Sequence, residues 1–345
     1  MILSTQENDL AKRVTIKSIA EDLGISHMTV SRALSGSPNV SSQTRILIEN
    51  RARDLGYVKS AAAKAMRGDG TKIVGLLLPN ITNDFYARYA NAFAKECDRN
   101  GLHLVIHLTD DEIEKERVSI RQLREIQAMA VVMVPCAHGV ARQDRNIEGL
   151  NVIQLVRSRE MTSNSSSLVI NDAEAIHDAV VHLRMLGFDR IGYIGADPSL
   201  STGRDRFQSY HNGLTSVGLE LDANLVIRGA PNFELGFSGV PRLLEGQGAT
   251  ALICGGVEIS NGAISALMQR HDGSGNAFGF VGYGDPAFLS WIGKGLPGIQ
   301  LPIEELAAIT IQQIGAFNGE ARDVPPATHA LKAELAARVG KITFT

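Results

Sequence analysis

The stretch "TIKSIAEDLGISHMTVSRAL", residues 15–34, contains two short helical patterns joined by a tight turn. Apolar residues recur at helical spacing as far as Leu23, and Gly24 then ends the first helix, because glycine readily adopts a left-handed conformation. The second helix begins at Ser26, whose hydroxyl can accept hydrogen bonds from the first turn. A third helix is expected over residues 42–55. Together these elements predict a helix-turn-helix domain.

The second predicted helix has two different faces. Its apolar residues fall on one face by the 3.6-residue period, so they point toward the other helices. The opposite face carries no acidic side chain, and it consists of His27, Met28, Ser31 and Arg32.

Charge is distributed unevenly along the chain. Residues 11–72 hold eleven Lys and Arg against five Asp and Glu, so this segment carries +6 although the whole chain of 345 residues carries −3. A basic module on an acidic body favours binding of nucleic acid, because attraction to phosphate needs local positive charge. A merely solvated basic surface would show the same charge.

Several other classes of protein fit poorly. The N-terminus has no basic, apolar and small-residue succession typical of a secretory signal, and no apolar run approaches the roughly 20 residues that span a bilayer. We therefore expect a cytoplasmic protein without membrane contact. Cys97, Cys136 and Cys254 are widely separated, which favours buried thiols over disulfides or a zinc site, and no metal or cofactor is expected.

Beyond residue 71 the chain alternates strands with helices. Near-continuous apolar strands separated by amphipathic helices predict α/β architecture with doubly wound parallel sheets, and about 270 residues suggest two lobes with a cleft between them. Ligands bind such sheets beyond the carboxyl ends of the strands, so loops after residues 79, 135, 196 and 285 should line the cleft. The predicted strands cover residues 72–79, 102–108, 130–135, 151–156, 167–171, 190–196, 223–229, 250–256 and 277–285.

These motifs closely resemble the lactose-repressor (LacI/GalR) family of bacterial transcription regulators. The run "TVSRAL", the closing "LGYV", and later "STGRDRF" and "VGYGD" follow the family in order. The resemblance implies a helix-turn-helix headpiece, a hinge helix and a two-lobed periplasmic-binding-protein-like effector domain. It also implies a homodimer on a pseudo-palindromic operator in double-stranded DNA, and "ALKAELAARVGKITFT" shows no leucine heptad for a tetramer.

The resemblance and the composition together divide the chain into four parts. We expect a disordered N-terminal extension over residues 1–13 and the DNA-binding domain over residues 14–58. The alanine-rich segment 59–70 corresponds to the hinge helix or linker, and residues 71–345 to the effector-binding and dimerisation domain.

The resemblance assigns DNA contacts by position. His27 and Met28 match positions that read base edges, although Met28 could instead pack inward and His27 could be an ordinary surface residue. Arg32 could bind guanine in a bidentate contact. Hydroxyls and Asn39 would approach the backbone, and Met66 would wedge into the minor groove between flanking basic residues. The remaining residues are Thr15, Ser26, Thr29, Ser31, Lys64 and Arg67.

For the effector, the resemblance points to the cleft loops. Arg206 matches the family's effector-binding arginine, whereas Gly284 stands where sugar-responsive relatives place an aspartate. A cleft that keeps arginine and loses carboxylates should prefer an anion such as a sugar acid. Arg157 could join Arg206 or point outward into a salt bridge. The other candidates are Asn80, Asn83, Phe85, Tyr86, Asn171, Asp172, Phe233 and Asp285.

The predicted function is therefore a ligand-responsive, sequence-specific DNA-binding regulator, most simply a repressor of a catabolic operon. An enzyme is not expected, since no nucleophile motif, metal cluster or phosphate loop is present. A periplasmic-type solute-binding protein would share the large domain, but it would be exported and would lack residues 15–67.

Overall fold

The computed structural model describes residues 14–57, 71–136, 147–161, 165–270, 277–317 and 327–343. The chain separates into two compact units, residues 1–70 and 71–345. The predicted hinge contacts of Lys64, Met66 and Arg67 lie outside the described residues.

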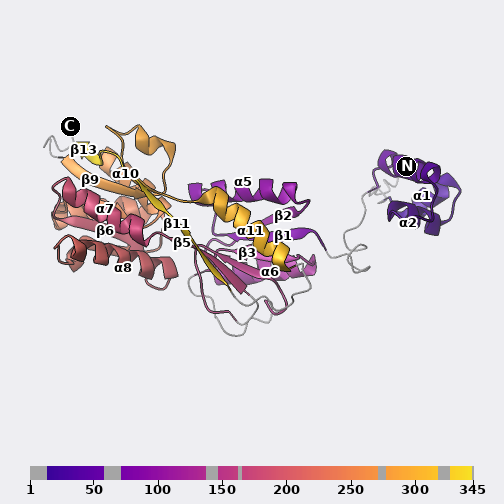
Figure 1. Cartoon of the computed structure of the whole chain (residues 1–345), viewed down its shortest axis with the longest axis horizontal. Coiled ribbons are helices and arrows are strands. Elements are labelled where there is room, and N and C mark those ends of the chain that lie inside the picture. The colour runs from indigo at the N-terminus through magenta and orange to yellow at the C-terminus, as the bar shows by residue number, and fades with distance from the viewer. Residues whose placement is uncertain are drawn as a thin grey trace, which may run out of the picture. The chain divides into compact units, whose positions relative to one another are not determined.

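The first unit contains three short helices, as the sequence predicted (Figure 1). Their packing encloses a small core in which six apolar side chains are almost completely inaccessible to solvent. The helices are α1 (Ile16–Leu23), α2 (His27–Leu34) and α3 (Ser42–Asp54). The core residues are Ile19, Ala20, Val30, Ala33, Ile48 and Ala52.

Each of these helices begins at a hydroxyl side chain. Thr15, Ser26 and Ser41 each accept a hydrogen bond from the backbone N–H three residues further on, which satisfies a group that the helix itself leaves unpaired. At the other end of α1, Gly24 adopts φ +64°, and its backbone N–H donates to the carbonyls of Ala20 and Glu21 in the last turn. The turn between α1 and α2 is thus encoded by two neighbouring residues, Gly24 and Ser26.

The second unit contains two sheets with the same strand order. The first follows β11-β5-β4-β3-β1-β2 and is parallel, and the second follows β12-β10-β9-β8-β6-β7, in which β12 and the added β13 pair antiparallel. The first sheet contains β1 (Ile73–Leu78), β2 (His103–Leu108), β3 (Ala130–Met133), β4 (Val152–Leu155), β5 (Ser165–Asn171) and β11 (Thr328–Lys332). The second contains β6 (Ile191–Ala196), β7 (Val226–Gly229), β8 (Ala251–Cys254), β9 (Ala277–Tyr283), β10 (Gly298–Gln300), β12 (Glu334–Ala336) and β13 (Lys341–Thr343).

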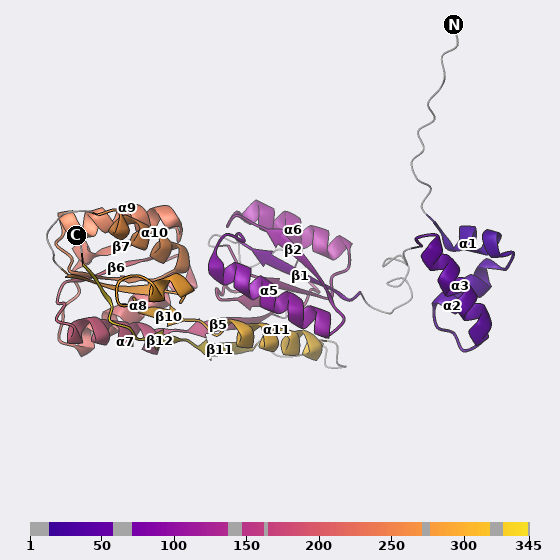
Figure 2. The same cartoon turned by 90° about the horizontal axis from the view of Figure 1, so that it is seen from above.

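Helices cover both faces of each sheet (Figure 2). In the first lobe α5 and α11 pack together on one face and α6 lies on the other, while in the second lobe α7 pairs with α8 and α9 with α10. This confirms the doubly wound architecture. The helices are α5 (Asp84–Arg99), α6 (Ile113–Glu125), α7 (Ala173–Met185), α8 (Ser201–Ser216), α9 (Phe233–Pro241), α10 (Val257–Met268) and α11 (Ile303–Phe317).

The chain crosses between the lobes three times. It leaves the first sheet after β5, returns between β10 and α11, and leaves again between β11 and β12. Both sheets therefore contain strands from distant parts of the sequence. The nine predicted strands all form, and the four late strands β10–β13 were missed, because three of them span only three residues each.

The interior of the second unit is apolar, and Cys97, Cys136 and Cys254 are buried in it as free thiols, as predicted. Among the described residues, none of the helices combines the length and the apolar character that crossing a membrane would require.

Candidate functional site: an exposed helix and a polar cavity

The outward face of α2 is open to solvent. His27, Met28 and Arg32 are exposed, Met28 to 50%, whereas Val30 and Ala33 on the opposite side are 0% and 1% exposed. The alternative in which Met28 packs into the core is therefore wrong. Helix α2 is held by its neighbours through one face and presents the other as a continuous surface.

Two of the predicted phosphate-contacting hydroxyls, Ser26 and Thr29, lie at the start of α2, whereas Thr15 caps α1. Ser26 Oγ accepts from the Thr29 N–H at 3.1 Å, and the two hydroxyl oxygens lie 2.8 Å apart. Thr15 and Asn39 are exposed, while Ser31 and Thr29 are half-buried.

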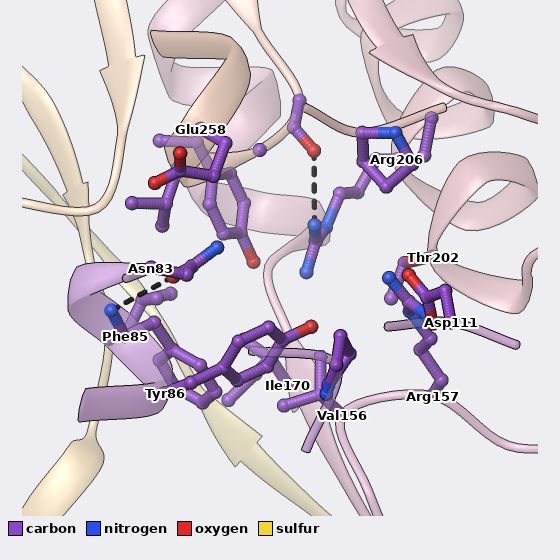
Figure 3. Close-up of a pocket in the computed structure, with 18 of the residues that line it drawn as sticks. Asn83, Phe85, Tyr86, Asp111, Val156, Arg157, Ile170, Thr202, Arg206 and Glu258 are labelled. Carbon is purple, nitrogen blue, oxygen red and sulfur yellow. Dashed lines mark hydrogen bonds and ion pairs between the residues drawn. The ribbon is translucent and has the colours of Figure 1, made fainter. Parts of the chain in front are cut away.

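The cavity of the second unit is formed at the carboxyl ends of strands from both sheets (Figure 3). It contains about 660 Å³ of space free of protein atoms, including the part open to solvent. Six of the predicted effector-binding residues line it: Asn80, Asn83, Phe85, Tyr86, Arg157 and Arg206.

Three other predicted residues do not line this cavity. Asn171 is exposed at the end of β5, and Phe233 is 42% exposed and stacks on Phe237 with ring centroids 5.8 Å apart. Asp285 makes a bidentate ion pair with Arg338, at 2.7 and 3.0 Å. The lining of the cavity therefore does not support the prediction that these three side chains contact an effector.

Arg206 is held firmly in the cavity wall. Its Nε donates to Asp172 Oδ2 at 2.7 Å, its Nη1 donates to the Gly255 carbonyl at 3.0 Å, and its guanidinium lies 3.9 Å from the centroid of the Tyr283 ring. The Tyr283 hydroxyl donates to the same Asp172 oxygen at 2.5 Å. Asp172 does not line the cavity itself, but it pairs with Arg206, which does. Its carboxylate balances the charge of Arg206 without any ligand.

Arg157 points into the cavity and also forms a salt bridge there. Its side chain is 7% exposed, and Nη1 donates to Asp111 Oδ1 at 2.6 Å. Asp111 follows β2 and lines the cavity, although no sequence motif singled it out. The alternative in which Arg157 points outward is therefore wrong, because its salt bridge lies in the cavity wall.

Aromatic side chains occupy the opposite side of the cavity (Figure 3). Asn83 caps α5 by accepting from the Phe85 N–H at 3.0 Å, which fixes the first turn from which Phe85 and Tyr86 project. The two rings meet edge to face with centroids 5.6 Å apart. Burial raises the pKa of Tyr86, so its phenol stays protonated and can donate a hydrogen bond.

Glu258, in the first turn of α10, adds another carboxylate to the cavity. Burial raises its pKa, and the nearby Asp84 carboxylate raises it further, while a hydrogen bond from Asn261 lowers it. The cavity thus holds two carboxylates, Asp111 and Glu258, that the cleft motifs did not predict. They offset part of the positive charge on which the expected preference for an anion depended, and that preference stays a prediction.

Comparisons with known proteins agree with this geometry. Residues 15–60 match the model "Bacterial regulatory proteins, lacI family", and residues 71–277 match "Periplasmic binding proteins and sugar binding domain of LacI family". The two matched segments correspond to the helical unit and to most of the two-lobed unit.

Individual relatives are similar over most of their length. The HTH-type transcriptional regulator GalR of Escherichia coli (strain K12) is 26% identical over 329 residues, covering 94% of this chain and 94% of GalR. The sucrose operon repressor of Klebsiella pneumoniae is 28% identical over 266 residues, covering 75% and 79%. The crystal structure of the Lac repressor dimer bound to operator and the anti-inducer ONPF matches with a TM-score of 0.76 at 19% identity, covering 95% and 99%.

Proposed function

The chain belongs to the lacI family of bacterial regulatory proteins and is a ligand-responsive, DNA-binding transcriptional regulator, and we propose that α2 reads operator bases while the cavity binds the effector. The observation that carries this proposal is the outward face of α2. Its side chains are exposed on a helix whose other face is fixed in a core, which is the arrangement that a major groove accepts.

The proposed roles are those that the family resemblance assigns to each position. Arg32 forms a bidentate contact with a guanine, and His27 and Met28 contact neighbouring base edges. The hydroxyls of Thr15, Ser26, Thr29 and Ser31, together with Asn39, contact phosphates and set the register. Lys64, Met66 and Arg67 would act in the minor groove, a proposal that depends on the family resemblance.

Coupling between effector and DNA passes through the crossovers between the lobes. Asp172 directly follows β5, where the chain first crosses, and it is bonded to Arg206 in the cavity wall. An effector that contacts Arg206 therefore acts on a group joined to a crossover, and it biases the arrangement of the lobes.

We propose a homodimer that binds a pseudo-palindromic operator in the cytoplasm and represses a catabolic operon. The names of the similar GalR and sucrose operon repressor support a regulator of this kind, as does the Lac repressor dimer. The match over residues 15–60 favours a regulator over a solute-binding protein.

The test is selection of genomic DNA fragments by the purified protein, followed by sequencing. We expect recovered fragments to share a palindromic motif, and Arg32→Ala to lose about 1–3 kcal/mol of discrimination at one base pair of each half-site. Arg53→Ala, which removes an exposed arginine of α3, is the control and should keep the motif. Absence of a shared palindrome, or full discrimination by Arg32→Ala, would contradict the proposal.

A further inference from the structure

We propose that Glu258 makes one end of the cavity a subsite for a protonated amine, so that the effector carries an ammonium group. The proposal rests on the proposed function, since it takes the cavity as the effector site. It concerns the end of the cavity away from the two buried arginines, and it adds a requirement for positive charge there, whatever group the arginines bind.

The charged groups in and behind the cavity wall do not balance. Each of the two buried arginines has a carboxylate partner, 2.6 Å away for Arg157 and 2.7 Å away for Arg206. Glu258 pairs with no cation among the described residues, and its hydrogen bond there comes from the neutral amide of Asn261, 3.2 Å from Glu258 Oε1. Together these groups carry one more negative charge than positive, and the surplus lies at Glu258.

The surroundings of Glu258 disfavour its negative charge. Burial raises the pKa of Glu258, the Asp84 carboxylate raises it further, and only the hydrogen bond from Asn261 lowers it. Asp84 lies in the first turn of α5 in the first lobe and has a partner of its own in Arg88, 3.8 Å away. A half-buried carboxylate without a cation is costly, and a ligand ammonium group would offset that cost.

Aromatic rings lie at the same end of the cavity as this carboxylate. Phe85 and Tyr86 line the side on which Glu258 lies (Figure 3). Arg157 and Arg206 lie on the other side. Aromatic faces attract a cation, and they exclude water, which strengthens an ion pair with a carboxylate. An ammonium group at this end therefore meets a carboxylate and aromatic faces without approaching either guanidinium group.

The Tyr86 hydroxyl adds a second requirement for the ligand. Tyr86 is 8% exposed, and its hydroxyl points into the cavity and has no hydrogen-bond partner among the described residues (Figure 3). Because burial raises the pKa of Tyr86, the phenol stays protonated and has a hydrogen bond to donate. The ligand that satisfies both Tyr86 and Glu258 is an amine that also carries a hydrogen-bond acceptor.

The experiment measures thermal unfolding of the full chain with pairs of compounds that differ in the amine. The pairs are D-glucosamine with D-glucose, 5-amino-1-pentanol with 1,5-pentanediol, and 5-aminopentanoate with pentanoate. We expect the amine of at least one pair to raise the unfolding temperature by about 2–4 °C more than its counterpart does. The pair that responds shows whether the amine belongs to an amino sugar, an amino alcohol or an amino acid.

The decisive variant is Glu258→Gln, which removes the charge and keeps an acceptor for Asn261. It should weaken binding of the active amine about tenfold and leave binding of the counterpart unchanged, so the preference disappears. Without ligand, this variant should unfold at the same temperature as the wild type or at a higher one, because an uncompensated charge is gone. A residue that served stability alone would show the reverse.

The matched control is Glu234→Gln. Glu234 is an exposed glutamate in the first turn of α9, in the same lobe, and it does not line the cavity. This variant should keep the full preference for the amine, because only a carboxylate in the cavity wall contacts the ligand.

Three results would overturn the proposal: no amine that stabilises more than its counterpart, an unchanged preference in Glu258→Gln, or an equal loss of preference in Glu234→Gln. DNA-fragment selection on the same preparations keeps the two proposals apart. If the wild-type protein recovers a palindrome while the preference fails, only the amine subsite is rejected, whereas failure to recover a palindrome contradicts the proposed function.

Discussion

The exposed face of α2 and the cavity use arginine in opposite ways. Arg32 is exposed and has no partner among the described residues, whereas Arg206 is 7% exposed and is bonded to Asp172 and Gly255. Water and counterions screen an exposed arginine, so Arg32 needs no partner within the protein. A buried arginine loses that screening, so its charge must be compensated by the protein itself.

The largest effect is expected from a charge placed in the core of the first unit. Val30→Asp should destabilise that unit by more than about 5 kcal/mol, because Val30 is completely buried in a core of only six such residues. Specific DNA binding should disappear while the second unit unfolds at its usual temperature. Calorimetry together with DNA-binding titration checks this, and a lower unfolding temperature of residues 71–345 would show that the two units are not independent.

The same comparison explains what the sequence could predict. Helices α1–α3 follow from local signals, namely hydroxyl caps, Gly24 and the 3.6-residue period, and all three form as expected. Predicting the exposed face of α2 required no further information, because the side chains opposite the buried face of a helix point outward.

The cavity was only partly predictable. Arg206, Phe85 and Tyr86 follow recognisable motifs. Asp111, after β2, and Glu258, in the first turn of α10, reach the cavity because the fold brings the ends of the two sheets together, which no local pattern encodes. The ion pair between Asp111 and Arg157 could not be predicted from the sequence either, because the two residues are 46 positions apart in the chain. For this reason the balance of charge in the cavity could not be predicted from the motifs alone.

A smaller effect is expected from removing a paired arginine of the cavity. Arg206→Ala should lower the free energy of unfolding of the second unit by about 3–5 kcal/mol, because the buried Asp172 carboxylate would lose its ion-pair partner. Arg32→Ala, by contrast, should change stability by less than about 0.5 kcal/mol. Denaturant titration of both variants measures the difference, and similar values for the two would refute the contrast between paired and unpaired arginines.

The smallest effect concerns two stacked tyrosines of the second lobe, Tyr193 on β6 and Tyr210 on α8, whose ring centroids lie 4.9 Å apart. The Tyr210 hydroxyl donates to the Ile191 carbonyl at 2.7 Å, so Tyr210→Phe should cost about 1 kcal/mol. The Tyr193 hydroxyl is buried without a partner among the described residues, so Tyr193→Phe should be neutral or stabilising by about 1 kcal/mol. Equal destabilisation by both changes, measured in denaturant, would contradict the assignment of partners.

The three crossovers between the lobes have a consequence for synthesis of the chain. The first lobe contains β1 near the beginning of the second unit, yet its edge strand β11 and its covering helix α11 are encoded within residues 303–332. On a ribosome, the lobe that is translated first therefore stays incomplete until almost the whole chain has emerged. The two lobes must mature together, so a chain that stops before residue 328 would leave each sheet without one of its edge strands, β11 or β12, instead of producing one finished lobe.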